Sequence, residues 1–516
     1  MSDLTGTGIT RRDVLKLLSV LPLLTVDLPT LQAGRLPAAQ DENLPNFLIL
    51  VFDALSAFHL PFYGYARQTA PNLTRFAEKA TVFHQHHAGG NFTTPGTSSL
   101  LTGALPWSTR AFHLQGTVIE PYVKRNIFSE LGKKGYYRTA YSHNNLVTSL
   151  FFQFHQDIDE FIPTRELCLL DDEFADQLFP NDYTPAFLGE WLTFRGGETR
   201  PSSLFLSFVH RLYRSLHKRM KTRDYRDQFP RGIPELHNLS FVLEDATDWI
   251  INQVQKMPRP FLAYYHLLPP HEPYLTRKDF VDIFHDGWKP VEKPEHPFTE
   301  GHTNQFLLRN RREYDEYIAY ADAEFGRLYD ALEKNGSLEN TYLIVTSDHG
   351  EMFERGVRGH VTPVLYEPVI RVPLLIKKPG QQAREDVHIP TSCVDVLPTL
   401  LHLAGLEIPD WAEGQVLPTF GAGEPDSERS IFALEAKKNQ KHAPLTKRTV
   451  MMVKDRYKIM HFTGYEKYND VFEMYDLQDD PEELNNIFNS HPALASEMKS
   501  EMFERLVQAD NNFLGA

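Results

Sequence analysis

Two short segments of the sequence carry carboxylate and histidine side chains that could bind one metal ion. The pentapeptide SDHGE over 347–351 follows an apolar run, and Asp53 ends another apolar run near the N-terminus. Asp348 and His349, side by side, can both bind one divalent metal ion, and Asp53 could add a second carboxylate. Because Asp-His-Gly also occurs in ordinary turns, the interpretation depends on what the rest of the chain brings to these residues.

A third segment offers a hydroxyl nucleophile. In NFTTPGTSSLLTG over 91–103, Thr93 and Thr94 stand directly before Pro95, which suits the first turn of a helix. A hydroxyl there lies in the positive field of the helix N-terminus, which attracts anions. A metal ion on that oxygen would lower its pKa and make it a nucleophile. The structural alternative is that threonine only caps the helix.

Short apolar runs alternate with helical segments along most of the chain. The continuous apolar run 46–53 predicts a strand buried on both faces, and strands are also predicted over 137–142, 261–267 and 341–347. Helical spacing predicts helices over 72–80, capped by Asn72, and over 309–334. This alternation predicts an α/β fold with a doubly wound, mostly parallel sheet.

The candidate residues lie at the carboxyl ends of the predicted strands. Ligands of doubly wound sheets bind at the carboxyl ends of the strands. Asp53, His271 and Asp348 all lie at or just beyond the end of a predicted strand. We therefore expect them to meet at one edge of the sheet.

The remainder of the chain divides into recognisable parts. A stretch over 408–428, rich in Pro, Gly and acidic residues, indicates a hinge. Beyond it, short strands over 450–453, 457–462 and 472–477 and a helix from about Pro492 predict a small α+β subdomain. We expect these parts: a signal and linker over 1–45, a catalytic domain over 46–425 with an insertion over 146–257 that sets specificity, and a C-terminal α+β subdomain over 426–516.

Composition excludes several classes of protein. The formal net charge of the 516 residues is −15, and the pI near 5.8 argues against nucleic acid as a partner. The only cysteines, Cys168 and Cys393, lie in no CxxC or nucleophile setting. A disulfide scaffold, a cysteine-rich zinc site and a cysteine nucleophile are therefore not expected.

The N-terminus predicts export. Arg11 and Arg12 precede an apolar stretch over 17–26 that is too short for a membrane span, which needs about 20 residues. This pattern is typical of a twin-arginine signal, so we expect a periplasmic or extracellular protein without a transmembrane anchor.

A basic segment over 204–226 is expected to be a solvated helix face, with weak contact to an anionic membrane surface as the alternative.

Taken in order, these motifs resemble the sulfatase family of the alkaline phosphatase superfamily over nearly the whole mature chain. The matching segments are NFLILVFDALSAFHLPFYGY, TTPGT with LLTG, HEPY, SDHGEMFERGVRGH, RVPLLIKKPG, VDVLPTLLHLAG, DRYKIM and EMYDLQDDPEELNN. The resemblance implies an alkaline phosphatase-like fold and the metal ligands Asp53, Thr93, Asp348 and His349. It also implies that His271 and His360 contact the transferring group of the substrate or protonate its leaving oxygen.

The sequence departs from the family pattern at five positions. Thr93 replaces the cysteine or serine that becomes formylglycine, Thr97 replaces an arginine, and Ala54 replaces a second aspartate. His349 replaces the asparagine of calcium-binding sulfatases, and Asn144 replaces a lysine. We therefore expect no formylglycine and a single divalent metal ion, with manganese or zinc favoured over calcium because of the nitrogen ligand.

These departures decide the expected reaction. One metal ion with neutral donors such as Asn144 suits the single negative charge of a phosphodiester better than the double charge of a phosphomonoester. We expect cleavage or transfer of a phosphoric (di)ester through Thr93, acting on a small-molecule, glycan or lipid ester. One alternative is a sulfuric ester hydrolase, and another, of a different class, is a non-catalytic protein that binds anions.

Overall fold

The computed structural model describes the chain except for residues 1–43, 170–214, 237–238, 423–425, 427 and 515–516. Residues 41–516 form one compact unit. The expected signal segment and the first half of the basic segment 204–226 lie outside the described residues. Residues 215–221 of that segment are helical, and Leu216 and Met220 are exposed there.

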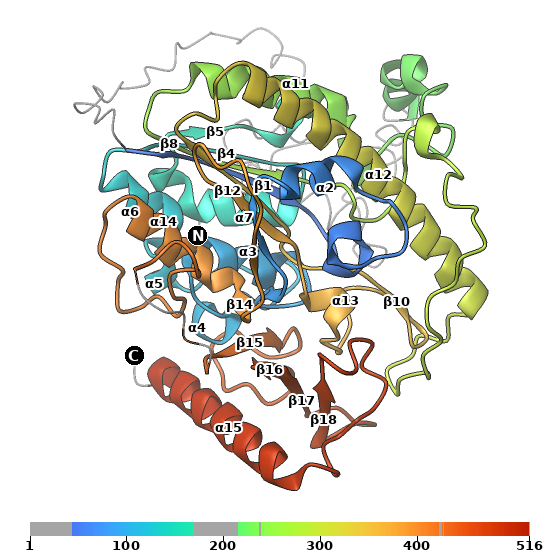
Figure 1. The fold of residues 1–516 in the computed structure, drawn as a ribbon, viewed down its shortest axis with the longest axis vertical. Helices are drawn as coiled ribbons and strands as arrows, with labels where there is room; N and C mark the ends of the chain where they lie inside the picture. The colour runs from blue at the N-terminus through green and yellow to red at the C-terminus, as the bar shows by residue number, and fades with distance from the viewer. Residues whose placement is uncertain (1–43, 170–214, 237–238, 423–425, 427, 515–516) are drawn as a thin grey trace, which may run out of the picture. The chain divides into compact units, whose positions relative to one another are not determined.

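An eight-stranded sheet forms the centre of the molecule (Figure 1). Its strand order is β13-β2-β12-β9-β1-β8-β4-β5. Five neighbouring strands are parallel: β9 (Thr341–Thr346), β1 (Asn46–Phe52), β8 (Phe261–Leu267), β4 (Tyr137–Ser142) and β5 (Glu160–Phe161). The four predicted strands are therefore confirmed to within one residue at each end.

The far edge of the sheet differs from the sequence expectation. It consists of β12 (Leu374–Lys377), β2 (Thr81–Phe83) and β13 (Glu385–Val387), of which β12 runs antiparallel to both of its neighbours. These strands have only three or four residues, so their pattern is too short to read from sequence alone.

Helices cover both faces of this sheet, because β1 sends alternate apolar side chains to opposite sides. Leu48 and Leu50 pack on one side, against the following helices: α2 (Pro71–Ala77), α11 (Leu243–Lys256) and α12 (Asn304–Lys334). Phe47 and Ile49 pack on the other side, against these: α3 (Thr93–Thr102), α6 (Ile127–Gly132), α7 (Asn145–Phe154) and α14 (Val396–Leu403). The predicted doubly wound α/β architecture is confirmed.

The predicted cap of α2 is wrong. The helix begins at Pro71, so Asn72 lies inside its first turn. Asp322 of α12 accepts hydrogen bonds from the backbone N–H groups of Asn72 and Leu73 at 2.9 and 2.7 Å. A carboxylate from a distant helix thus satisfies the donors that a local cap would have taken.

A four-stranded antiparallel sheet follows the eight-stranded sheet along the chain. Its strands are β15 (Ser430–Glu435), β16 (Arg448–Lys454), β17 (Tyr457–Thr463) and β18 (Val471–Asp476), and α15 (Pro492–Leu514) packs on it (Figure 1). The sequence predicted the last three strands and the helix but not β15.

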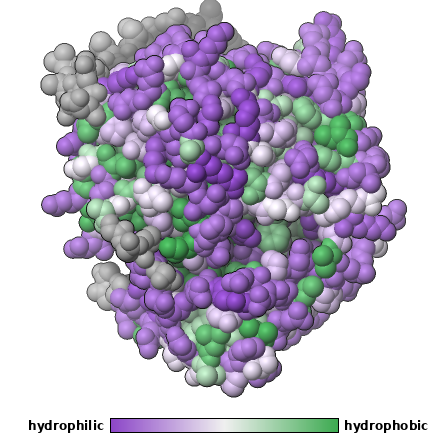
Figure 2. Space-filling view, in the orientation of Figure 1, coloured by the Kyte–Doolittle hydropathy of each residue, from purple (hydrophilic) through white to green (hydrophobic). Residues whose placement is uncertain are grey.

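Among the described residues no helix is both long and apolar enough to cross a membrane, and the visible face is largely hydrophilic (Figure 2).

A buried cluster of charges joins the four-stranded sheet to α13 (Glu367–Ile370). Lys458 of β17 lies between the carboxylates of Glu367 and Glu483, with Nζ–O distances of 3.0 and 2.7 Å. All three side chains are nearly inaccessible to water. Removing one partner from such a cluster leaves an uncompensated buried charge.

We predict that Lys458→Met lowers the free energy of unfolding by about 3 kcal/mol or more, because two buried carboxylates lose their shared cation. Urea unfolding followed by circular dichroism measures this change. Lys454→Met is the matched control. Its partners Glu497 and Glu501 are solvent-exposed or partly so, and we expect a loss below about 1 kcal/mol. Equal effects of the two substitutions would contradict the interpretation.

Candidate active site

The carboxyl ends of β1 and β9 bring three candidate ligands together. The two strands are parallel neighbours with Val51 paired to Thr346, so Asp53 and Asp348 emerge at the same edge. One ligand atom from each of Asp53, Asp348 and His349 lies within 4.8 Å of the others, and all three residues are buried. His349 Nε2 lies 3.4 Å from Asp53 Oδ1 and 3.6 Å from Asp348 Oδ2.

The first residue of α3 adds a hydroxyl to this group. Thr93 Oγ1 lies 3.4 Å from His349 Nε2, whereas Thr94 Oγ1 donates to the carbonyl oxygen of Leu114 at 3.0 Å. The structure thus places Thr93, and not Thr94, beside the carboxylates. Gly96 permits this approach: a Cβ atom at that position would lie 2.0 Å from the backbone oxygen of Asp348.

The carboxylate of Asp53 is arranged to bind a cation. Its Oδ2 accepts hydrogen bonds from Asn144 Nδ2 at 2.6 Å and His266 Nε2 at 3.1 Å. Its Oδ1 is buried and has no hydrogen-bond partner among the described residues. Two carboxylates and an imidazole are ordinary ligands of divalent metal ions, so Asp53, Asp348 and His349 fit one such ion.

The ionisable groups around the two carboxylates show the same demand for a cation. Burial opposes ionisation of the Asp53 carboxyl group, but His271, His266 and His349 outweigh it and lower its pKa well below the usual value. Burial and the neighbouring Asp53 carboxylate raise the pKa of Asp348. Burial also lowers the pKa of His349, yet the two carboxylates reverse this and raise it to about 9. The two carboxylates thus favour positive charge at this point of the site.

Two further predicted residues lie on the solvent side of this group. The ring of His360 lies 4.2 Å from that of His349 and 4.9 Å from that of His271, measured between centroids. His271 Nδ1 contacts the carbonyl oxygen of Glu272 at 2.7 Å, and His360 Nδ1 contacts Glu351 at 3.1 Å. His271 and His360 are 8 % and 6 % exposed, against 0 % for His349, so the site reaches solvent through these two rings.

Asn144 is held in place as the cap of α7. Its Oδ1 accepts the backbone N–H of Leu146 at 2.9 Å, which directs Nδ2 toward Asp53 and toward Thr93 Oγ1, 3.2 Å away. All seven candidate residues therefore lie in one group, and their catalytic roles stay predictions.

The sequence analysis missed two residues of this group. Glu351 is fully buried against His360, and burial raises its pKa to about 7. It belongs to the pentapeptide that supplied Asp348, so its position beside a metal ligand was the available signal. His266 lies inside β8, where a buried strand pattern gives no sign of chemistry.

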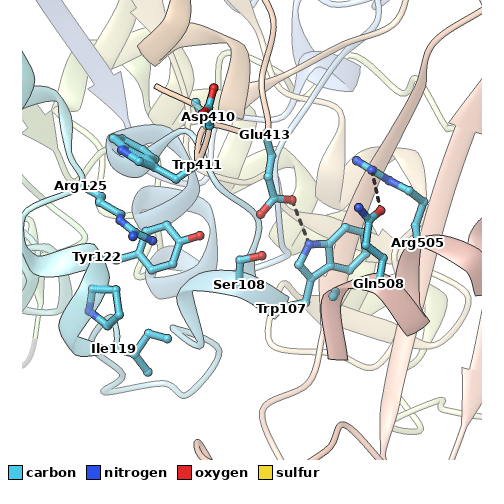
Figure 3. A pocket seen from close by; sticks show the side chains of 13 residues that line it. Trp107, Ser108, Ile119, Tyr122, Arg125, Asp410, Trp411, Glu413, Arg505 and Gln508 are labelled. Atoms are coloured by element: carbon cyan, nitrogen blue, oxygen red, sulfur yellow. Dashed lines mark hydrogen bonds between the residues drawn. The ribbon is translucent and has the colours of Figure 1, made fainter. Parts of the chain in front are cut away.

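One pocket lies away from these residues. It encloses about 460 Å³ between α4 (Pro106–Thr109), α5 (Glu120–Val123), the 410–413 loop and α15 (Figure 3). Its polar groups pair with each other: Glu413 accepts from Trp107 Nε1, and Arg505 donates to Gln508 (Figure 3). None of the candidate catalytic residues lines it.

The eight-stranded sheet with helices on both faces has an alkaline phosphatase-like fold. A family model described as Sulfatase matches residues 45–406, and one described as N-sulphoglucosamine sulphohydrolase, C-terminal, matches residues 361–512. The chain therefore belongs to the sulfatase family, whose enzymes are hydrolases of ester bonds that use a divalent metal ion.

Individual relatives agree with this assignment. The chain is 25 % identical to a choline-sulfatase of Rhizobium meliloti, covering 86 % of this chain and 82 % of that one. It is 26 % identical to an ulvan-active sulfatase of Formosa agariphila, covering 77 % and 68 %. A phosphonate monoester hydrolase of Agrobacterium radiobacter shares the fold, with a TM-score of 0.63, 18 % identity and coverage of 90 % and 96 %.

We predict that Asp348→Asn abolishes stoichiometric metal binding, because a neutral amide replaces a charged ligand in a buried site. The measurement is metal content per chain by mass spectrometry after loading and desalting. Asp322→Asn is the control: Asp322 is equally buried but binds the N-terminus of α2. If both variants retained the wild-type metal content, the ligand assignment would be wrong.

We predict that Gly96→Ala weakens metal binding about tenfold or more, since the added methyl group meets backbone and must push α3 away from Asp348. Calorimetric titration of the metal-free protein measures the affinity. Gly421→Ala is the matched control, because its nearest neighbour is the side chain of Val416 at 3.2 Å. Unchanged affinity in Gly96→Ala would show that the close approach is not required.

Proposed function

We propose that this enzyme hydrolyses sulfuric esters at the metal site, with Thr93 as the nucleophile. The observation that carries the assignment of the nucleophile is the position of Thr93 Oγ1, 3.4 Å from His349 Nε2. The family and the named relatives favour a sulfuric ester over the phosphoric diester that the sequence analysis expected first.

The charge balance of the site agrees with this substrate. A sulfate monoester carries one negative charge, as a phosphodiester does, so the argument from one metal ion and neutral donors applies to both. Asn144 supplies such a neutral donor at the nucleophile. A doubly charged phosphomonoester would leave one charge uncompensated.

A divalent ion held by Asp53, Asp348 and His349 would lower the pKa of the Thr93 hydroxyl and offset charge on the ester oxygens. We favour manganese or zinc over calcium because His349 offers nitrogen. Asn144 Nδ2 orients Thr93 Oγ1 for attack on sulfur in line with the leaving alkoxide.

The histidines at the solvent side act on the leaving group. Burial and the neighbouring His349 lower the pKa of His360 well below its usual value, so this ring is neutral. We therefore assign proton donation to His271 and orientation of the substrate to His360, whose Nδ1 is held by Glu351. Water then attacks the sulfur of the threonine sulfate ester, which releases sulfate and regenerates the hydroxyl.

Phosphoric diester cleavage or transfer is the second candidate, and Thr93 itself favours it. A threonine cannot form the aldehyde hydrate that expels sulfate, and an ester of its alkoxide must be cleaved by water or by an acceptor alcohol. For either reaction we propose a small-molecule, glycan or lipid ester as substrate.

We also propose export by the twin-arginine route, on the basis of Arg11 and Arg12.

We predict that the protein cleaves an aryl sulfate faster than an aryl phosphate diester or monoester. Release of nitrophenol from the three esters would be compared after chelation and addition of manganese, zinc or calcium. Dominant diester cleavage would replace the proposal with the second candidate. Absence of turnover on every ester and with every metal would favour the non-catalytic, anion-binding alternative.

We predict that Thr93→Ala lowers kcat/KM by about 10³-fold or more, because the nucleophile is lost. Thr94→Ala is the matched control, since its hydroxyl bonds the carbonyl of Leu114, and it should stay within a few-fold of wild type. Turnover of the preferred aryl ester measures both. Full activity of Thr93→Ala would exclude the covalent mechanism.

A further inference from the structure

We propose that His266 is a positioning residue that fixes which oxygen of Asp53 faces the metal ion. Neither the strand pattern nor the family resemblance assigned it a role. The inference concerns the metal site alone, so it does not depend on which ester the enzyme cleaves.

His266 lies next to both carboxylates. It belongs to β8, which pairs in parallel with β1 so that His266 stands opposite Val51, two residues before Asp53. Its side chain is completely buried, with Nε2 3.1 Å from Asp53 Oδ2 and 3.8 Å from Asp348 Oδ2.

The hydrogen bonds define the state of the ring. An ionised carboxylate only accepts hydrogen bonds, so Nε2 of His266 must carry the hydrogen that it shares with Asp53. Nδ1 lies 3.4 Å from the hydroxyl of Tyr264, which stands two residues earlier on the same face of β8. A neutral ring that donates through Nε2 and accepts through Nδ1 satisfies both partners.

This bond selects the oxygen that binds metal. His266 and Asn144 both donate to Oδ2 of Asp53, whereas Oδ1 has no partner among the described residues and lies 3.4 Å from His349 Nε2. Without His266, Oδ2 would keep one donor, and the carboxylate could rotate about its χ2 torsion. We expect the geometry of the site to loosen, which typically weakens metal binding about 10- to 100-fold.

The experiment compares four variants of the full chain by calorimetric titration of the metal-free protein with Zn²⁺. His266→Phe keeps the ring but removes the donor, and we expect its affinity to fall about 10- to 100-fold. His266→Gln places an amide N–H near the position of Nε2, and its affinity should stay within about threefold of wild type. The side chain of His266→Asn is too short for its amide to reach Asp53. Its Zn²⁺ affinity should therefore fall as that of His266→Phe does.

The control is His143→Phe, another buried histidine at the end of the adjacent strand β4, whose ring stacks on Phe241 at 4.2 Å. It should bind Zn²⁺ as wild type does. Thermal unfolding of each metal-free variant checks that it folds. If His266→Phe does not fold, the contrast between His266→Gln and His266→Asn decides the matter.

A spectrum separates positioning from direct ligation. With Co²⁺ bound, the d–d absorption bands of His266→Gln should match those of wild type, because the ligands are unchanged. Altered bands would show that His266 is itself a ligand and would overturn the proposal. Wild-type Zn²⁺ affinity in His266→Phe would overturn it as well, since the bond to Asp53 would then have no effect.

Discussion

The placement of two carboxylates side by side in the protein interior is the constraint on which the rest of the site depends. Asp53 and Asp348 are at most 1 % exposed, so water cannot screen their repulsion. Everything around them supplies positive charge or hydrogen-bond donors: three histidines, the amide of Asn144 and the N-terminus of α3. A divalent ion completes this balance, and the proteins of this family are built to receive one.

The backbone contributes to the same balance. Ala54, directly after Asp53, adopts a left-handed conformation with φ of 62°, which is uncommon for a residue with a side chain. The resulting turn brings its N–H to 3.3 Å from Asp348 Oδ1. Ala54 thus contributes a main-chain donor to Asp348 and adds no carboxylate of its own to the site.

The sequence predicts the frame of the molecule better than the contacts that complete it. Strands β1, β8 and β9 are largely buried, so each reads as a mainly apolar run with few polar residues. The cap of α2 and the role of His266 could not be read in this way. Asp322 reaches α2 from 250 residues further along the chain, and His266 looks like one more core residue of a strand. Local patterns record burial, whereas such contacts depend on the tertiary arrangement.

The order of the ligands along the chain also constrains how the enzyme is made. Ala54 and Asp348 are in contact although 294 residues separate them, and parallel neighbours β1 and β9 span the same interval. Contacts of such high sequence separation slow folding, because the entropy of loop closure is lost before they stabilise the chain. During synthesis the growing chain cannot complete the metal site until residue 349 has left the ribosome. The chain can therefore bind the metal ion only after Asp348 and His349 have been synthesised. A chain truncated before them would contain Asp53 but could not form the metal site.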